Sequence, residues 1–272
     1  MVSLPFSDHC EPLLDSAETF TAIAQELKRE FDAGKWNYIE LRPKNDISDI
    51  DGVVKALPCF LHELDLTPAK EDLLRKTHKS CIQAPIRRAE RDGIEYESGN
   101  SERLLRAFFR LMVQTRRRQE LPPQPIEWFR NLISCMGDRL RIRVAFYQGK
   151  EIASILTLRH GSTEVYKYGC SDSQFNNLGA TPFLLWKMIA EAKEEGFKSA
   201  DFGRSDADNP GLIAFKSRWG SKPSQLTYLR WTRQRGEDPA RARSAGALKR
   251  LFAVLPDPVL EATGRILYRH IG

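Results

Sequence analysis

The sequence predicts an α+β fold in which helices flank a mixed sheet. Apolar residues recur at helical spacing in some segments and alternate at strand spacing in others, so both kinds of element are expected. Three strands are expected between residues 140 and 170, and the glycine-centred turn 148–150 joins the first two as a hairpin. A long helical segment separates these strands from two more, which indicates a crossover connection and a mixed sheet.

Residues 1–98 contain the first group of expected elements. Residues 16–33 carry apolar side chains on one helical face and end at Gly34, which predicts a helix. Two strands, a basic helix and a short strand are expected next, at 36–41, 57–66, 70–91 and 94–97.

Residues 99–232 contain the second group. Ser101 can cap a helix that runs to about residue 119, because its hydroxyl can accept a hydrogen bond from a free N–H group of the first turn. A second helix is expected at 126–136, after a proline-rich break. The remaining strands are expected at 140–147, 151–159, 164–170, 198–202 and 225–231, with a long helix at 182–195.

Composition limits the class of protein. A hydrophobic share of 41% and the lack of an apolar run of membrane-spanning length predict a soluble globular chain. The first residues lack the features of a signal peptide, so a cytoplasmic location is expected. The net charge of +6 favours anionic partners such as nucleic acid, nucleotide phosphates or an acidic membrane face. The five cysteines form no C-x-x-C pair, so neither a disulfide framework nor a metal site is expected.

The strongest chemical signal lies in residues 201–220. This segment leaves a strand through Asp-Phe-Gly, crosses a turn rich in Asp, Gly and Pro, and ends in Phe-Lys-x-x-Trp-Gly. Lys216 therefore follows a strand end in an otherwise apolar segment, where a cation suits an anion or a developing oxyanion. The alternative is a solvated lysine on a short helix.

Three stretches together resemble the FemABX family of aminoacyltransferases and its FemAB-like relatives. The first is the basic segment 75–93, and the second is Thr-Arg-Arg-Arg at 115–118, followed by several prolines. The third and most specific runs from Tyr-x-Tyr-Gly at 166–169 to Phe-Lys-x-x-Trp-Gly at 215–220. The order of the elements is also similar to that of an N-acetyltransferase-like (GNAT) domain.

The resemblance implies a domain organisation. Residues 99–232 would be a complete GNAT-like acyltransferase domain, and residues 1–98 a truncated first GNAT-like domain. Residues 233–272 would be a basic helical tail, which either packs on the truncated domain or lies on an anionic membrane surface. A truncated sheet would leave an unpaired edge, so a homo-oligomer is a further expectation.

The resemblance also implies roles for individual residues. Lys216 would contact substrate phosphate and the reacting carbonyl. Phe215, also expected at the substrate site, would pack the segment, which a simple core residue would do as well. Arg118 would bind a nucleotide-sugar diphosphate, since a guanidinium matches phosphate bidentately; the adjacent Arg116 and Arg117 leave the exact assignment open. Arg204 is a further expected substrate-binding residue.

Two tyrosines complete the expected substrate site. Tyr166 and Tyr168 alternate on a strand and are therefore expected to share a face. One of them would orient a substrate amide or phosphate, and cross-strand packing is the alternative. Asp201, Asp206 and Asp208 are the nearest carboxylates to Lys216, and one of them would accept the amine proton. The alternative is turn chemistry at 206–211, and a structural role is expected for Asp201.

Residues 177–182 stand where a GNAT enzyme has its pyrophosphate loop. Gly179 and Ala180 give a partial match, and backbone N–H groups at a helix start can bind phosphate. No cofactor is the main expectation, and coenzyme A stays open.

The expected function is N-acyl transfer, with an aminoacyl-tRNA as donor and an amine of a peptidoglycan precursor as acceptor. One alternative is an N-acetyltransferase that uses acyl-CoA or another acyl thioester to modify a polysaccharide acceptor in exopolysaccharide biosynthesis. The other is a catalytically inactive FemAB-like module.

Overall fold

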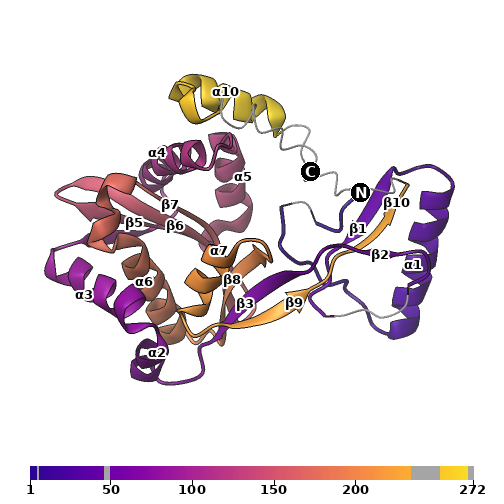
Figure 1. The fold of residues 1–272 in the computed structure, drawn as a ribbon, viewed down its shortest axis with the longest axis horizontal. Helices are drawn as coiled ribbons and strands as arrows, with labels where there is room; N and C mark the ends of the chain where they lie inside the picture. The colour runs from indigo at the N-terminus through magenta and orange to yellow at the C-terminus, as the bar shows by residue number, and fades with distance from the viewer. Residues whose placement is uncertain (5, 46–49, 234–251, 269–272) are drawn as a thin grey trace.

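Two sheets organise the part of the chain that the computed structural model describes, residues 1–4, 6–45, 50–233 and 252–268 (Figure 1). The large sheet has seven strands in the order β4-β5-β6-β7-β8-β3-β9, and the small sheet has three in the order β1-β10-β2. The strands are β1 (Tyr38–Leu41), β2 (Val54–Lys55), β3 (Cys59–Asp65), β4 (Glu95–Gly99), β5 (Leu140–Tyr147), β6 (Lys150–His160), β7 (Thr163–Ser171), β8 (Ser199–Asp206), β9 (Lys222–Leu226) and β10 (Leu229–Thr232).

Helices cover both faces of the large sheet, which confirms the predicted α+β class. The helices are α1 (Ala17–Asp32), α2 (Lys70–Lys76), α3 (Ala84–Arg91), α4 (Glu102–Arg118), α5 (Ile126–Met136), α6 (Ala180–Glu194), α7 (Pro210–Ser217) and α10 (Asp257–Leu267). Shorter helical turns are η1 (Lys79–Gln83), η2 (Gly137–Arg139) and η3 (Ser173–Leu178). One apolar core lies between the sheet and α3 and α6, and a second lies between the sheet and α4, α5 and α10.

Local signals account for several helix boundaries. The hydroxyl of Ser101 accepts a hydrogen bond from the N–H of Leu104, which confirms the predicted cap of α4. The single basic helix expected at 70–91 is wrong, because the backbone becomes extended at Thr77 and His78. The N–H of His78 instead donates to the carbonyl of Arg218, so a contact from the end of α7 divides the segment.

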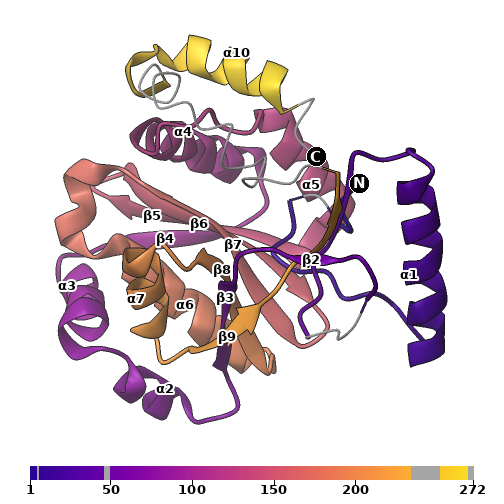
Figure 2. The ribbon, with the colours of Figure 1, turned by 45° about the vertical axis from the view of Figure 1, so that its right-hand side comes forward.

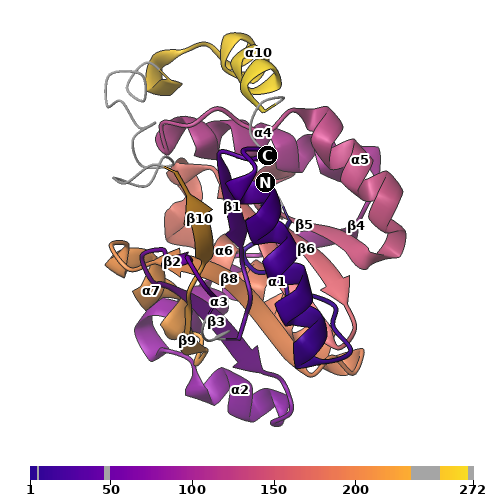
Figure 3. The same ribbon diagram turned by 90° about the vertical axis from the view of Figure 1, so that its right-hand side faces the viewer.

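The single strand expected at 225–231 is also wrong. Its first half, β9, pairs with β3 at the edge of the large sheet. Its second half, β10, pairs between β1 and β2 in the small sheet, along which α1 lies (Figure 3). Residues 225–231 therefore contribute strands to two sheets. The alternation of side chains does not reveal where the first strand ends and the second begins.

Both sheets cross the division that the sequence suggested between residues 98 and 99. In the large sheet, β3 and β4 pair with strands from residues 99–232. In the small sheet, β10 joins β1 to β2. Pairing between distant segments leaves no local pattern in the sequence. The order of the elements alone therefore could not show that strands from both sides of this division share each sheet.

The tail helix α10 packs on the second core and lies outside α4 (Figure 2). Leu260 is completely buried there, and Gly264 lies so close to the carbonyl of Pro123 that a Cβ atom would collide with it. One expectation was packing on residues 1–98; the tail packs on the α4–α5 side and meets residues 1–98 at Phe6, whose ring centre lies 6.0 Å from that of Tyr268. Residues 234–251 and 269–272 of the predicted tail lie outside the described residues. No helix in the described ranges is both long and apolar enough to cross a membrane.

A buried ion network ties the meander to α6. Arg143 of β5 is inaccessible to solvent and pairs with Glu164 of β7 at 2.9 Å and with Glu191 of α6 at 2.8 Å. Arg159 of β6 pairs with the same Glu164 at 2.9 Å. Since each charged group of this network has a partner, the network fixes the relative positions of β5, β6, β7 and α6.

Candidate active site

The large sheet opens between its two parallel strands, β7 and β8. They are paired only at Thr163–Ser199, Glu164–Ala200 and Val165–Asp201. Beyond that point each strand contains a bulge, which increases local twist and bends the strand. We call the region where β7 and β8 diverge the splay.

The two bulges face this splay. In β7, Thr157 pairs with Tyr166 and Leu156 with Tyr168, so Lys167 is the extra residue. In β8, the register against β3 shifts between Asp201 and Arg204, so Phe202 and Gly203 together oppose one residue of β3. Lys167 is thus a site residue that sequence reasoning missed, because an alternating Tyr-Lys-Tyr gives no sign of a bulge.

The bulge in β8 depends on Gly203. Its φ of +72° lies in the region that glycine adopts most easily, and a Cβ atom there would lie 2.6 Å from Oδ2 of Asp8. The N–H of Gly203 donates to Oδ1 of Asp201 at 2.6 Å. The other oxygen of Asp201 lies 2.9 Å from Nε2 of His9. Asp201 therefore holds both the bulge and the N-terminal segment.

Lys216 reaches β8 from α7. Its Nζ donates to the carbonyl oxygens of Gly203 at 3.0 Å and Arg204 at 2.7 Å. Lys216 is only 4% exposed, so it is not a solvated lysine. Burial lowers its pKa to about 8, although the charges of Asp8 and Asp201 oppose the shift. The β8 bulge is thus bordered by a buried cation.

An N-terminal segment, residues 6–12, completes this side of the splay; we call it the strap. Asp8 accepts a long hydrogen bond of 3.4 Å from the N–H of Arg204 and lies 4.0 Å from Nζ of Lys167. The hydroxyl of Tyr228 donates to the backbone carbonyl of Asp8. Asp8 and His9 are nearly 200 residues from β8 in sequence, and no local pattern marks either of them as a site residue.

Arg204 borders the strap on the outside. Its guanidinium forms an ion pair with Asp206, donates to the hydroxyl of Tyr228 at 3.2 Å and lies 5.1 Å from the centre of that ring. The guanidinium of Arg42 lies 5.2 Å from the same ring centre. Two cations therefore hold the ring that anchors Asp8.

Tyr166 and Tyr168 do not share a face, which corrects the prediction. Tyr166 packs in the first core with its ring centre 6.4 Å from that of Phe202, and Tyr168 packs in the second core, 5.3 Å from Phe129. The extra residue, Lys167, shifts the alternation by one position and sends the two rings to opposite sides. Burial raises the pKa of both phenols, so both are neutral.

Arg118 lies at the far end of β7. Its guanidinium donates to the carbonyl of Ser171 at 2.6 Å and to the hydroxyl of Thr115 at 3.0 Å. Ser171 is four residues beyond Lys167, which corresponds to about 13 Å along a strand. Of its two neighbours, Arg117 pairs with Asp257 of α10. The structure therefore brings Lys216 and Arg204 to the splay, and it places Arg118 further along β7.

Three other predicted residues are packed against neighbouring elements. Phe215 of α7 is partly buried against the first core. Gly179, at the start of α6, faces the backbone carbonyl of Pro85 so closely that a Cβ atom would collide with it, and Ala180 is buried. At the same helix start, Ala180 and Thr181 line a separate cavity of about 190 Å³.

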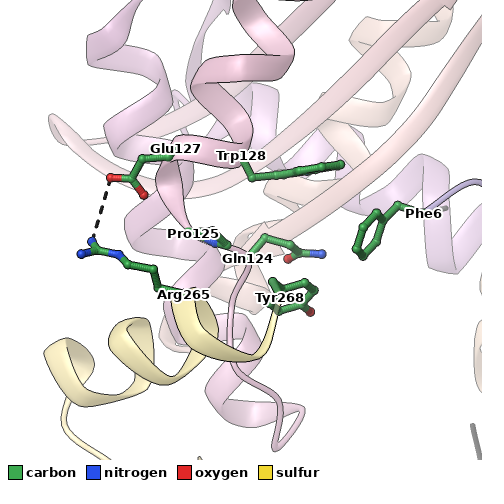
Figure 4. A pocket seen from close by; sticks show the side chains of 7 residues that line it. All are labelled: Phe6, Gln124, Pro125, Glu127, Trp128, Arg265 and Tyr268. Carbon is green, nitrogen blue, oxygen red and sulfur yellow. Dashed lines mark ion pairs between the residues drawn. The ribbon is translucent and has the colours of Figure 1, made fainter. Parts of the chain in front are cut away.

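A cavity of about 400 Å³ lies between α5, α10 and the strap (Figure 4). Trp128, Tyr268 and Phe6 form its aromatic side, with the ring centre of Phe6 5.0 Å from that of Trp128 and 6.0 Å from that of Tyr268. At the opposite side, Arg265 pairs with Glu127 at 3.9 Å. Across the described ranges, no three potential metal ligands come together.

Comparison with known proteins places this geometry in context. The acetyltransferase (GNAT) domain pattern matches residues 76–217, about half of the chain. The UDP-N-acetylmuramoylpentapeptide-lysine N(6)-alanyltransferase of Weissella viridescens is 31% identical over 157 residues, which cover 56% of this chain and 43% of that protein. The lipid II:glycine glycyltransferase of Staphylococcus aureus is 31% identical over 84 residues, which cover 29% of this chain and 20% of that protein. The chain thus spans less than half the length of these relatives.

Solved structures share the fold. A crystal structure of FemX matches with a TM-score of 0.61 and 16% identity, over 77% of this chain and 76% of that one. The C-terminal domain of a putative lysylphosphatidylglycerol synthetase from Agrobacterium fabrum matches with a TM-score of 0.56 and 15% identity, over 84% and 76%. At such identities the likeness concerns the fold alone.

Proposed function

Because the chain belongs to the acetyltransferase (GNAT) domain family, we propose that it transfers an acyl group to an amine. We propose an aminoacyl-tRNA as the donor and an amine of a peptidoglycan precursor as the acceptor. The names of the two relatives support this choice, since one is an alanyltransferase acting on a muramoyl-pentapeptide lysine and the other a lipid II glycyltransferase.

One observation carries the proposal: a buried lysine borders the opening between two parallel strands. Attack of an amine on an ester produces a tetrahedral intermediate with a negatively charged oxygen. A fixed donor for such an oxygen can contribute about 3 kcal/mol to stabilising the transition state. Lys216 supplies a positive charge at the β8 bulge, and Lys167 supplies a second across the splay.

Arg118 supports a second binding region further along β7. A nucleotide-linked precursor carries phosphates, and the Arg118 guanidinium lies at Ser171, about 13 Å along β7 from Lys167, which suits an anionic group remote from the reacting amine. The remote group would add binding energy and help to orient the amine.

An acyl thioester acting on a polysaccharide is the alternative within the same fold. The pyrophosphate of coenzyme A would then bind at the start of α6, where Ala180 and Thr181 line a cavity of about 190 Å³. A cytoplasmic location, self-association and membrane contact through the tail stay proposals; the burial of Leu260 favours a tail packed on the protein.

The test is a transfer assay. Radiolabelled alanyl-tRNA and glycyl-tRNA are each incubated with the chain and UDP-N-acetylmuramoyl-pentapeptide, and the acylated peptide is detected by mass spectrometry. We expect transfer by the parent and a loss of roughly a hundredfold or more in Lys216→Met, whereas Lys79→Met, at an exposed lysine of η1, retains activity. Saturable binding and turnover of acetyl-CoA without transfer from charged tRNA would contradict the proposal, and no turnover with any donor would support an inactive module.

A further inference from the structure

The strap places a carboxylate at the mouth of the splay. Oδ2 of Asp8 lies beside Gly203 and accepts from the N–H of Arg204 at 3.4 Å. The carboxylate is 38% exposed, so a substrate group can reach it. Asp8 is therefore a negative charge on the same bulge that Lys216 supports from the other side.

Three contacts position the strap and the carboxylate at the splay. The hydroxyl of Tyr228 holds the backbone carbonyl of Asp8, and Asp201 holds the next residue, His9, at 2.9 Å. Lys167 lies 4.0 Å away across the splay. The backbone that carries Asp8 is therefore held on both sides of this residue, which is the support expected of a group that acts on a substrate.

On the basis of the proposed acyl transfer, we propose that Asp8 is a catalytic residue: it binds the ammonium form of the acceptor amine at the splay and takes its proton. The acceptor amine is protonated at neutral pH and cannot attack a carbonyl until it loses a proton. A carboxylate attracts this cation, whereas Lys167 and Lys216 repel it and instead suit the oxyanion.

The proposed step balances as follows. One proton of the ammonium passes to the Asp8 carboxylate, and the freed electron pair forms the C–N bond to the ester carbon while the carbonyl electrons move to oxygen. The C=O bond then re-forms and the bond to the ribose oxygen breaks. A second proton passes from nitrogen to that oxygen, and Asp8 releases its proton to solvent. The products are an amide, the free ribose hydroxyl of the tRNA and one proton.

The experiment compares two acceptors that differ in protonation. Alanyl-tRNA is the donor, and the acceptors at pH 7 are the lysine-containing UDP-N-acetylmuramoyl-pentapeptide and hydroxylamine, which is mostly neutral at this pH. Parent, Asp8→Asn and the control Asp138→Asn, at an exposed carboxylate in η2, are measured with both. We expect Asp8→Asn to lower kcat/KM for the pentapeptide about a hundredfold or more, and to leave hydroxylamine transfer within about threefold of the parent.

Each other outcome overturns the inference. Equal losses with both acceptors mean that Asp8 only supports the site, and gains with both mean that its carboxylate merely blocks the splay. An active parent that is insensitive to Asp8→Asn overturns this inference alone. A parent that transfers to neither acceptor overturns the proposed function as well. Asn is nearly isosteric with Asp, and urea unfolding of Asp8→Asn checks that the variant is folded.

Discussion

Replacing Lys216 with methionine should change the pH dependence of the protein's stability. Lys216 is 4% exposed and burial lowers its pKa from 10.5 to about 8. The unfolded chain therefore binds a proton on this group at a pH where the folded chain has released it. Stability consequently increases as the pH rises from about 8 to 10.5. Methionine has a similar length and no charge, so the variant lacks this dependence.

The magnitude follows from the pKa difference. A difference of one pKa unit corresponds to about 1.4 kcal/mol, so holding the protonated lysine in the fold costs roughly 3 kcal/mol at pH 7. The cost decreases by roughly 1 kcal/mol by pH 9 and by roughly 3 kcal/mol by pH 10.5. The variant also loses the donor to the carbonyls of Gly203 and Arg204, which is a penalty that does not vary with pH. The change of the stability difference with pH therefore tests the reasoning better than the sign of that difference at one pH.

The assay is urea unfolding followed by tryptophan fluorescence at pH 7, 8, 9 and 10. The measured quantity is the free energy of unfolding of Lys216→Met minus that of the parent. We expect this difference to become steadily more negative as the pH rises, because the parent gains stability and the variant does not. Ionisation of tyrosines and cysteines occurs in both proteins and cancels, and Lys79→Met serves as the exposed control. A difference that stays constant from pH 7 to 10 would refute the reasoning.

The remaining predictions concern packing. Gly203→Ala should cost about 1–2 kcal/mol in the free energy of unfolding and displace Asp8, lowering transfer to the pentapeptide; retained activity with this acceptor would contradict this. Arg143→Met should cost about 3–5 kcal/mol, since it leaves buried carboxylates short of a partner, and an unchanged urea midpoint would argue against it. Gly264→Val should force α10 away from the carbonyl of Pro123, which hydrogen exchange would detect as lost protection in α10.

The sequence predicted features that depend on neighbouring residues or on an ordered motif. The cap at Ser101 is local, and the order of the helices and strands gave the correct fold class and family resemblance. Lys216 was found because its motif fixes its place after β8. The faces of Tyr166 and Tyr168 were wrong, because one extra residue in a strand reverses the alternation and bulges have no firm sequence pattern.

Contacts between distant segments were beyond local reasoning. Asp8 approaches β8 through a strap separated from it by most of the chain, and no alternation or spacing relates the two. The same holds for Pro85, whose carbonyl occupies the space opposite Gly179. Such pairs are specified by three-dimensional packing, so they become visible only once the sheets are assembled.

The place of β10 in the small sheet has a consequence for biosynthesis. β10 lies between β1 and β2, although it is about 190 residues later in the chain, and Tyr228 directly before it anchors the strap. During synthesis, β1 and β2 therefore cannot pair with β10 until residues 228–232 have been made. Chains are synthesised at about 5–20 residues per second, so this wait lasts on the order of ten seconds or more. The strap is thus anchored last, and a nascent chain cannot complete its splay before this strand has left the ribosome.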